Sequence, residues 1–249
     1  MNQAVQPVNP PVKISVVIPV LNEARLIART LEGLAVQVLP EDVGIEVLIA
    51  DGGSTDGTMA AIETFFEIND SMPVRVFGSE RGRAQQQNCG AAFAQGDVLL
   101  FLHADTVPAP NAVAELAKAI RRPETLFGYF PVKYQAAPPN VLADVYSAAT
   151  EINSVLFHYG DSGIFARRSF FERIGRFTEM ELLEDVEFLL RAQKESSPVL
   201  ITNAFVTTSS RRFERHGFAA TQLLNAAVVG LYLLGAPPKD LRSLYDLFK

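Results

Sequence analysis

Several residue types are scarce in this chain. It has no tryptophan, one cysteine and three histidines among its 249 residues. The single cysteine, Cys89, excludes an internal disulfide and any zinc site built from paired cysteines, and it fits a reducing compartment. The chain also lacks a positive net charge, since its formal net charge is −6 and its pI is near 5.2. Because nucleic-acid-binding domains are usually basic, we expect no nucleic-acid partner.

The chain has no long apolar run, since none approaches the roughly 20 residues that a membrane-spanning helix needs. Residues 1–12 show no signal-peptide pattern, so we expect a flexible lead-in and a cytoplasmic protein. The most apolar stretch is 219–236. Three interpretations of it stay open, namely packing in the core, contact in a homodimer, and peripheral contact with the inner membrane face near a lipid acceptor.

Apolar strands alternate with helical patterns over about the first 120 residues. This alternation predicts an α/β fold with a mostly parallel sheet and helices on both faces. The expected strands are 13–20, 45–50, 74–77 and 97–103, and the expected helices are 26–34, 58–68, 83–95 and 111–121.

The alternation ends after residue 120. The expected elements are then a strand at 127–134, a helix at 141–157, a strand at 163–166, a helix at 183–193 and a strand pair or edge at 199–207. We expect one domain over 13–217, with a nucleotide-binding half (13–120) and a mixed half (121–217). A helical extension would follow over 218–249.

The most informative segment is an acidic, glycine-rich turn after the second expected strand. Asp51 ends that strand, and Gly52 and Gly53 permit backbone conformations closed to other residues. Because open α/β sheets bind ligands at the carboxyl ends of their strands, Asp51 could accept hydrogen bonds from a base or ribose. The same turn is also typical of a strand-to-helix connection capped by one of residues 54–56.

A second acidic position, Asp105, follows the fourth expected strand. His103 precedes it by two residues, on the same side of an extended chain. A carboxylate there could hold Mg²⁺ or Mn²⁺ together with substrate phosphates. Because Pro108 and Pro110 follow closely, an ordinary turn aspartate is the alternative.

A third acidic position is the pair Glu184 and Asp185, which opens an otherwise apolar helix. A rigid carboxylate at a helix start facing a cleft could act as a general base. The helix dipole also favours acidic residues at this position, so simple capping is the alternative.

Two basic segments complete the candidates. Arg81 precedes the third expected helix and Arg83 begins it, and arginine can stack on a base or bind phosphate oxygens. Residues 207–217 carry Arg211, Arg212 and His216, a cluster that suits a diphosphate or an anionic acceptor. Solvated surface positions are the alternative for both segments.

Five segments in this order resemble the family 2 inverting glycosyltransferases of the GT-A fold. They are VVIPVLNE, IADGGSTDGT, GRAQQQNCG, LFLHADT and LLEDVEFLLR, and the resemblance runs from residue 14 to about 217. The segments GDSGIFARRSFFERIGRF and TSSRRFERHG are similar to a subgroup labelled arsenosugar-biosynthesis-associated or radical-SAM/selenodomain-associated transferases. The resemblance implies a Rossmann-like GT-A sheet, a mixed C-terminal half and C-terminal helices.

The resemblance also implies a reaction and a role for each matching position. A sugar would pass from a nucleotide diphosphate sugar, with uridine diphosphate as the expected nucleotide, to an acceptor hydroxyl. Asp185, beside Glu184, would be the general base, and Asp105 would bind Mg²⁺ or Mn²⁺, with His103 and His216 as further candidate ligands. The acceptor side would contain Gly160, Asp161, Ser162, Arg211 and Arg212. The donor site would contain Pro19, Leu21, Glu23, Asp51, Gly53, Arg83, Gln86, Asn88 and Ala104.

One departure from the family pattern leaves alternatives open. The family's paired-aspartate motif reads His103-Ala104-Asp105 here, so an imidazole replaces its first carboxylate. A non-catalytic nucleotide-sugar-binding protein is therefore one alternative. A sugar nucleotidyltransferase is another, although residues 21–24 lack the glycine-rich basic loop that would hold a triphosphate.

Overall fold

Strand β1 (Val12–Val20) is an interior strand of a seven-stranded sheet with the order β3-β2-β1-β4-β8-β6-β9. The computed structural model describes residues 11–69, 72–135, 141–209 and 217–246. Strands β2 (Val43–Asp51) and β4 (Val98–Phe101) pair in parallel with β1 on its two sides. Strand β3 (Val74–Gly78) pairs in parallel with β2. The four expected strands of the first half are therefore confirmed, and so is the mostly parallel α/β sheet.

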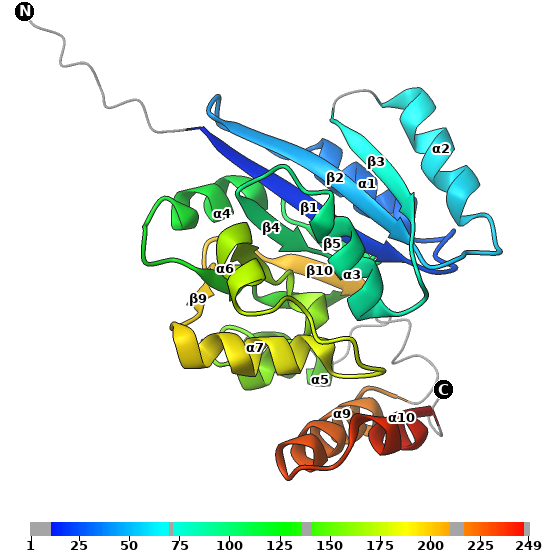
Figure 1. Cartoon of the computed structure of the whole chain (residues 1–249), viewed down its shortest axis with the longest axis vertical. Helices are drawn as coiled ribbons and strands as arrows, with labels where there is room; N and C mark the ends of the chain where they lie inside the picture. The colour runs from blue at the N-terminus through cyan, green and yellow to red at the C-terminus, as the bar shows by residue number, and fades with distance from the viewer. Residues whose placement is uncertain (1–10, 70–71, 136–140, 210–216, 247–249) are drawn as a thin grey trace, which may run out of the picture.

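Helices cover both faces of this sheet because its strands carry apolar residues on both sides (Figure 1). On one face, Val16 and its neighbours pack with α1 (Ile27–Ala35), α2 (Thr58–Ile68) and α4 (Ala112–Ile120). On the other face, Val17 and Leu99 pack with α3 (Arg83–Ala92), α6 (Arg168–Arg173) and α7 (Glu184–Glu195). The alternation of side chains along each strand thus separates two layers of core.

The mixed half completes the large sheet and adds a small one. Strand β8 (Phe165–Arg167) runs antiparallel between β4 and β6 (Phe127–Tyr129), and β9 (Val199–Leu200) pairs in parallel with β6. The small sheet has the order β5-β10-β7. Its strands are β5 (Thr106–Pro108), β10 (Val206–Ser209) and β7 (Val132–Gln135).

Two expected elements of this half are wrong in their extent. The strand expected at 127–134 divides between two sheets at Pro131, which has no N–H to continue a ladder. The helix expected at 141–157 is α5 (Val141–Ala149), followed by a 3-10 turn, Val155–Phe157. The Thr150 hydroxyl, which accepts from Val132 N at 2.8 Å, ties the end of α5 to β7.

Two expected elements of the first half end early. Strand β4 stops at Phe101, so His103 and Asp105 lie in a turn rather than in an extended strand. Helix α3 ends at Ala92, three residues before its expected end. At that end the chain returns toward β1, where Gly96 N donates to Ser15 Oγ at 2.9 Å.

The C-terminal residues form two helices, α9 (Phe218–Leu233) and α10 (Pro238–Asp246), which lie below the main body in Figure 1. A separate apolar cluster joins them to the start of α7 through Val228, Leu241 and Val186. Leu223 and Leu234 stay exposed on α9 and just after it. The helix at 219–236 therefore packs partly into a core, and the dimer and membrane interpretations stay predictions.

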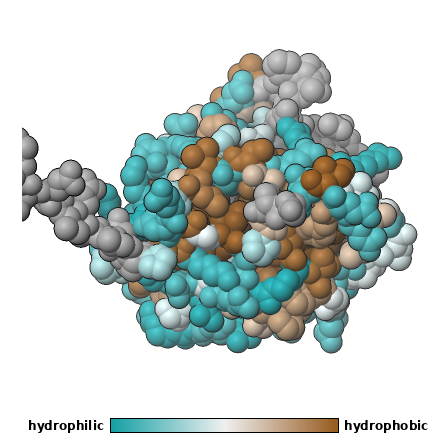
Figure 2. Space-filling view, turned by 90° about the horizontal axis from the view of Figure 1, so that it is seen from above, coloured by the Kyte–Doolittle hydropathy of each residue, from teal (hydrophilic) through white to brown (hydrophobic). Residues whose placement is uncertain are grey.

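Apolar surface is not confined to these C-terminal helices. Figure 2, seen from the opposite end of the molecule, shows hydrophobic residues gathered among hydrophilic ones. Within the described ranges, no helix combines the length and hydrophobicity needed to cross a membrane.

Candidate active site

A cavity of about 1120 Å³ opens at the carboxyl ends of β1 and β4. The sheet extends from β1 through β2 to β3 in one direction and through β4 in the other, so the strand order reverses at this point. Such a switch point leaves a crevice between the connections that leave neighbouring strands, and ligands bind there in open α/β sheets. The loops after β1 and β4 bring Leu21, Glu23, His103 and Asp105 into the cavity wall.

Most of the expected site residues meet in this cavity, although they come from five separate segments of the chain. Those lining it are Pro19, Leu21, Glu23, Arg83, Gln86, His103, Ala104, Asp105, Gly160, Asp161, Glu184 and Asp185. Asp51, Gly53, Asn88 and Ser162 are not among the lining residues. Arg211, Arg212 and His216 lie outside the described residues.

Asp185 is held at the cavity wall by two backbone N–H groups. Its Oδ2 accepts from Gly160 N at 2.5 Å, and its Oδ1 accepts from Val186 N at 2.8 Å. The residue is only 7% exposed. Because a carboxylate has about four acceptor sites, these two bonds orient Asp185 and leave it capacity to accept from a hydroxyl in the cavity.

Glu184 and Arg83 form a second charged element beside Asp185. Arg83 Nη1 lies 3.5 Å from Glu184 Oε1, and the Glu184 side chain is 3% exposed. Burial raises the pKa of Glu184, and Arg83 opposes that shift. Burial works to lower the pKa of Arg83, but Glu184 and Asp185 outweigh it and raise that pKa above its ordinary value. Arg83 therefore stays charged at the cavity wall, where it can meet a phosphate.

The backbone is strained just before Glu184. Leu183 has φ 69°, a left-handed conformation that is uncommon for a bulky residue, and it precedes the first turn of α7. Its side chain is buried in the cluster that joins α7 to the C-terminal helices. This packing can hold the strained turn, and strain of this kind gathers at functional sites.

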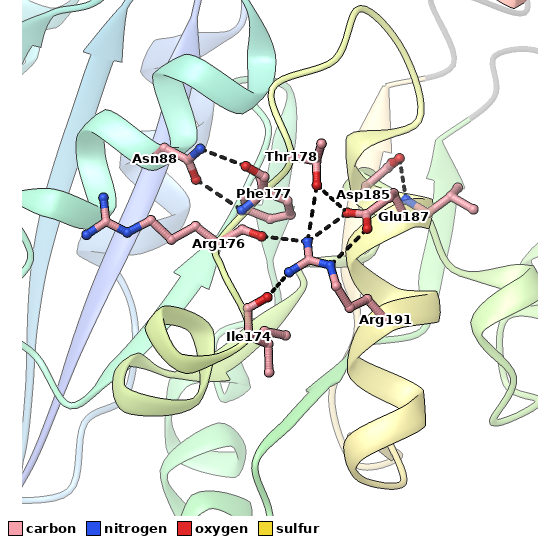
Figure 3. Close-up of polar contacts among 9 residues, drawn as sticks. Asn88, Ile174, Arg176, Phe177, Thr178, Asp185, Glu187 and Arg191 are labelled. Carbon is pink, nitrogen blue, oxygen red and sulfur yellow. Dashed lines mark hydrogen bonds and ion pairs between the residues drawn. The ribbon is translucent and has the colours of Figure 1, made fainter. Parts of the chain in front are cut away.

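The loop leading to α7 is fixed from both sides (Figure 3). On one side, Asn88 accepts from Phe177 N at 3.1 Å and donates to Phe177 O at 2.9 Å. On the other side, Arg191 of α7 donates to the carbonyls of Ile174 and Arg176 and pairs with Glu187. Asn88 thus fixes the loop that precedes α7, and its expected donor contact stays a prediction.

Two expected donor-site residues, Gln86 and Asp51, form hydrogen bonds within the protein that organise the strand ends. Gln86 Nε2 donates to Val20 O at 2.7 Å and to Ala50 O at 2.8 Å, which joins the ends of β1 and β2. Asp51 accepts from the Ser54 hydroxyl at 2.6 Å and from Ser54 N at 3.0 Å, so it organises its own turn. Gly53 has φ 89° in this turn, which explains the glycine.

The lining suits a cation that arrives with a phosphate ligand. Among the described residues, no group of three histidine, cysteine or acidic side chains could hold a metal ion. The described residues that line the cavity carry more carboxylates than guanidinium groups, so their net charge is negative. The carboxylates are Glu23, Asp105, Asp161, Glu179, Glu181, Glu184, Asp185 and Asp246, and the guanidinium groups are Arg81, Arg83 and Arg242. A cation bound beside Asp105 would offset part of this negative charge where a diphosphate binds.

His103 lies close to Gly160. A Cβ built on Gly160 would be 2.6 Å from His103 Nε2 and 3.1 Å from Asp185 Oδ2. The imidazole therefore packs at the side of the cavity where Asp185 is held, and the metal roles expected for His103 and Asp105 stay predictions. Glycine at position 160 is required by this close approach.

Sequence reasoning missed one wall of the cavity. Tyr134, Tyr146 and Tyr159 line it, together with Asn225 of α9 and Tyr245 of α10. These residues are widely spaced in the sequence and form no motif. The only available signal was the apolar character of 219–236, which indicated a buried helix without saying what it covers.

Comparison with known proteins places this geometry in a family. Residues 15–175 match glycosyl transferase family 2. Glycosyltransferase AglE of Haloferax volcanii is 34% identical over 95 residues, covering 38% of this chain and 31% of AglE. Staphylococcus aureus TarS 1-349 in complex with UDP-GlcNAc has a TM-score of 0.63 at 19% identity, covering 79% of this chain and 58% of that chain. The mannosyltransferase PcManGT from Pyrobaculum calidifontis, in complex with GDP-Man and Mn²⁺, has a TM-score of 0.66 at 21% identity, covering 95% of this chain and 69% of that chain.

The two solved structures show a shared GT-A fold, and the family match covers well over half of this chain. The chain spans about a third of the length of AglE. The matched residues contain the loops after β1 and β4, Arg83 and Gly160, and they end before α7 and the C-terminal helices. The chain belongs to glycosyl transferase family 2.

Proposed function

We propose that this protein is an inverting glycosyltransferase that moves a sugar from a nucleotide diphosphate sugar to an acceptor hydroxyl. One observation carries the proposal. Asp185, fixed by Gly160 N, faces the same cavity as Asp105 and Arg83, at the carboxyl ends of two parallel strands. A base and a diphosphate-binding group thus share one space.

The donor would lie along the loops after β1 and β4. Arg83 would bind a phosphate oxygen of the donor, and Asp105 would hold Mg²⁺ or Mn²⁺ jointly with the diphosphate. When bound, that cation would neutralise the negative charge that develops on the leaving diphosphate. The comparison proteins support a nucleotide-sugar donor, since TarS is in complex with UDP-GlcNAc and PcManGT with GDP-Man and Mn²⁺.

Asp185 would act as the general base in a single displacement. Its carboxylate would accept the proton of the acceptor hydroxyl while that oxygen attacks the anomeric carbon from the face opposite the diphosphate. The carbon–oxygen bond to the diphosphate breaks as the new glycosidic bond forms, so the anomeric configuration inverts. The Gly160 N–H would keep the carboxylate aimed during this step.

The test is calorimetric titration with UDP, GDP, UDP-GlcNAc, GDP-Man and UTP, each with and without Mn²⁺. We expect one nucleotide diphosphate sugar to bind, and Mn²⁺ to tighten its binding. Tighter binding of UTP than of every sugar nucleotide would favour a nucleotidyltransferase instead. Absence of binding across the series would overturn the proposed donor site.

A further inference from the structure

Three tyrosines form a wall of the cavity beside the proposed base. Tyr134 comes from β7, Tyr146 from α5 and Tyr159 from the residue before the 3-10 turn Gly160–Ser162. All three line the cavity and are half-buried. The ring centroids of Tyr134 and Tyr146 are 5.4 Å apart in an edge-on arrangement.

Helix α9 holds this aromatic wall in place. The buried ring of Phe218, the first residue of α9, lies 5.8 Å from the ring of Tyr134 and 5.9 Å from that of Tyr146. Further along α9, Thr221 and Asn225 line the same cavity. The three tyrosines lie within the part of the chain that matches the family, whereas the α9 residues that support them lie beyond it.

The wall is joined to the base by one short turn. Tyr159 precedes Gly160, whose N–H holds Asp185, and Asp161 follows it. Asp161 accepts from the Tyr134 hydroxyl at 2.7 Å. Residues 159–161 therefore supply a ring of the wall, the N–H that holds Asp185 and the carboxylate that binds Tyr134.

We propose that this wall is the acceptor site and that it takes a neutral cyclic polyol, such as a monosaccharide or a cyclitol. The proposal depends on the glycosyltransferase function proposed above. Aromatic faces with a few polar groups fit a ring that is apolar on its faces and hydroxylated around its edge. The carboxylates of Asp161 and Asp185 line the same cavity and disfavour a phosphorylated acceptor.

The protonation of the tyrosines agrees with this chemistry. Burial, together with the charge of Asp161, raises the pKa of Tyr134 well above its ordinary value, and burial raises the pKa of Tyr146. Both hydroxyls therefore stay protonated at neutral pH and add no negative charge to the wall, and the Tyr134 hydroxyl donates its single proton to Asp161.

The experiment first measures donor binding by calorimetry, with UDP-GlcNAc or GDP-Man and Mn²⁺. Acceptor binding to the protein with UDP or GDP and Mn²⁺ is then measured by saturation-transfer NMR. The probes are glucose, mannose, N-acetylglucosamine and myo-inositol, with glucose 6-phosphate and decyl phosphate as anionic counterparts. We expect at least one neutral ring to bind more tightly than both phosphates.

Three variants locate the binding. Tyr159→Ala should weaken binding of the neutral ring about tenfold through loss of an aromatic contact, whereas Tyr159→Phe should retain most of it. Tyr232→Phe is the matched control, because Tyr232 is on α9 and does not line the cavity. Thermal melting confirms that each variant is folded.

The outcomes separate two failures. If neither UDP-GlcNAc nor GDP-Man binds, the proposed donor site fails and the acceptor site falls with it. If the donor binds, then preference for a phosphate, absence of neutral-ring binding, or equal binding by Tyr159→Ala and the control overturns the acceptor proposal alone.

Discussion

The backbone N–H of Gly160 donates to Oδ2 of Asp185 at 2.5 Å, across 25 residues of sequence. This bond joins the turn Gly160–Ser162 to the first turn of α7. The proposed base is therefore oriented by a segment that also carries Tyr159 and Asp161. Catalysis and acceptor selection would depend on the same short piece of backbone.

Substitution of Gly160 should disturb this arrangement directly. In Gly160→Ala, the new Cβ would be 2.6 Å from His103 Nε2 and 3.1 Å from Asp185 Oδ2. We expect the free energy of unfolding to fall by about 1–3 kcal/mol, as overpacking does elsewhere, and turnover to fall more than donor affinity. Gly44→Ala is the control, because its Cβ would meet nothing within 4 Å. Urea unfolding and a donor-consumption assay measure the two effects, and equal behaviour of both variants would contradict the prediction.

Removal of the proposed base should affect turnover rather than donor binding. Asp185→Asn cannot take up the proton of the acceptor hydroxyl, so we expect turnover to fall by about 10²–10⁴-fold. Glu187→Gln serves as the control, since Glu187 is on the same helix but pairs with Arg191 and does not line the cavity. Steady-state rates and calorimetry with the donor separate the two effects. Normal turnover in Asp185→Asn would remove it from this role.

Metal affinity should depend on Asp105 and on the nucleotide. We expect Mn²⁺ to bind weakly to the protein alone and more tightly with UDP or GDP present, and Asp105→Asn should abolish that gain. His103→Asp would add a second carboxylate and should tighten Mn²⁺ binding by at least about tenfold. The measurement is free Mn²⁺ by electron paramagnetic resonance, which needs no turnover. Equal affinity in all three proteins would contradict a metal site at this position.

The ion pair between Arg83 and Glu184 should be asymmetric in its effect on stability. The side chain of Arg83 is 40% exposed and that of Glu184 is 3% exposed. Arg83→Gln leaves a buried carboxylate without its partner and should cost about 1–2 kcal/mol, less than a fully buried pair because solvent screens Arg83. Glu184→Gln should cost less, since water can solvate Arg83. Urea unfolding of both variants would reveal the difference, and the reverse order would refute it.

His158 should make the protein sensitive to mild acid. Its ring stacks on Tyr129 with centroids 3.7 Å apart, and burial lowers its pKa to about 4. In the unfolded chain this histidine takes up a proton near pH 6.5, whereas in the folded protein it stays neutral down to about pH 4. Its burial in the neutral form therefore contributes fully to the free energy of unfolding above pH 6.5. The contribution, about 3 kcal/mol, is lost as the pH falls toward 4. Urea unfolding at pH 7, 6 and 5 should show a shallower decline for His158→Gln. An unchanged slope would assign the acid sensitivity to other groups.

The first half of the fold could be predicted from the sequence because its signals are local. Strand β2 and helix α2 follow from an apolar run, a glycine-rich turn and an amphipathic stretch, and α2 has the bounds that were expected. The mixed half was less predictable. Strands β6 and β7 are contiguous apolar sequence, yet they enter different sheets at Pro131. Apolar periodicity cannot indicate which sheet a short strand joins.

The roles of site residues show the same division. Asp185 and Asp105 were expected from their motifs, and the structure brings both to one cavity. Asn88 was expected at the donor, yet its amide bonds to the backbone of Phe177. A polar side chain in a motif has the same appearance in sequence whether it contacts a ligand or positions a loop, because only its partners distinguish the two.

The sequence by itself determined the family, the parallel sheet and the acidic positions, since these depend on motifs and periodicity within short segments. Only the tertiary structure decided that Tyr134, Tyr146, Tyr159 and residues of the C-terminal helices line the same cavity as those acidic positions. Those residues lie far apart along the chain, and they meet because α9 buries Phe218 against the tyrosine rings and α10 packs beside the start of α7. Burial of apolar surface between distant segments carries no local signal.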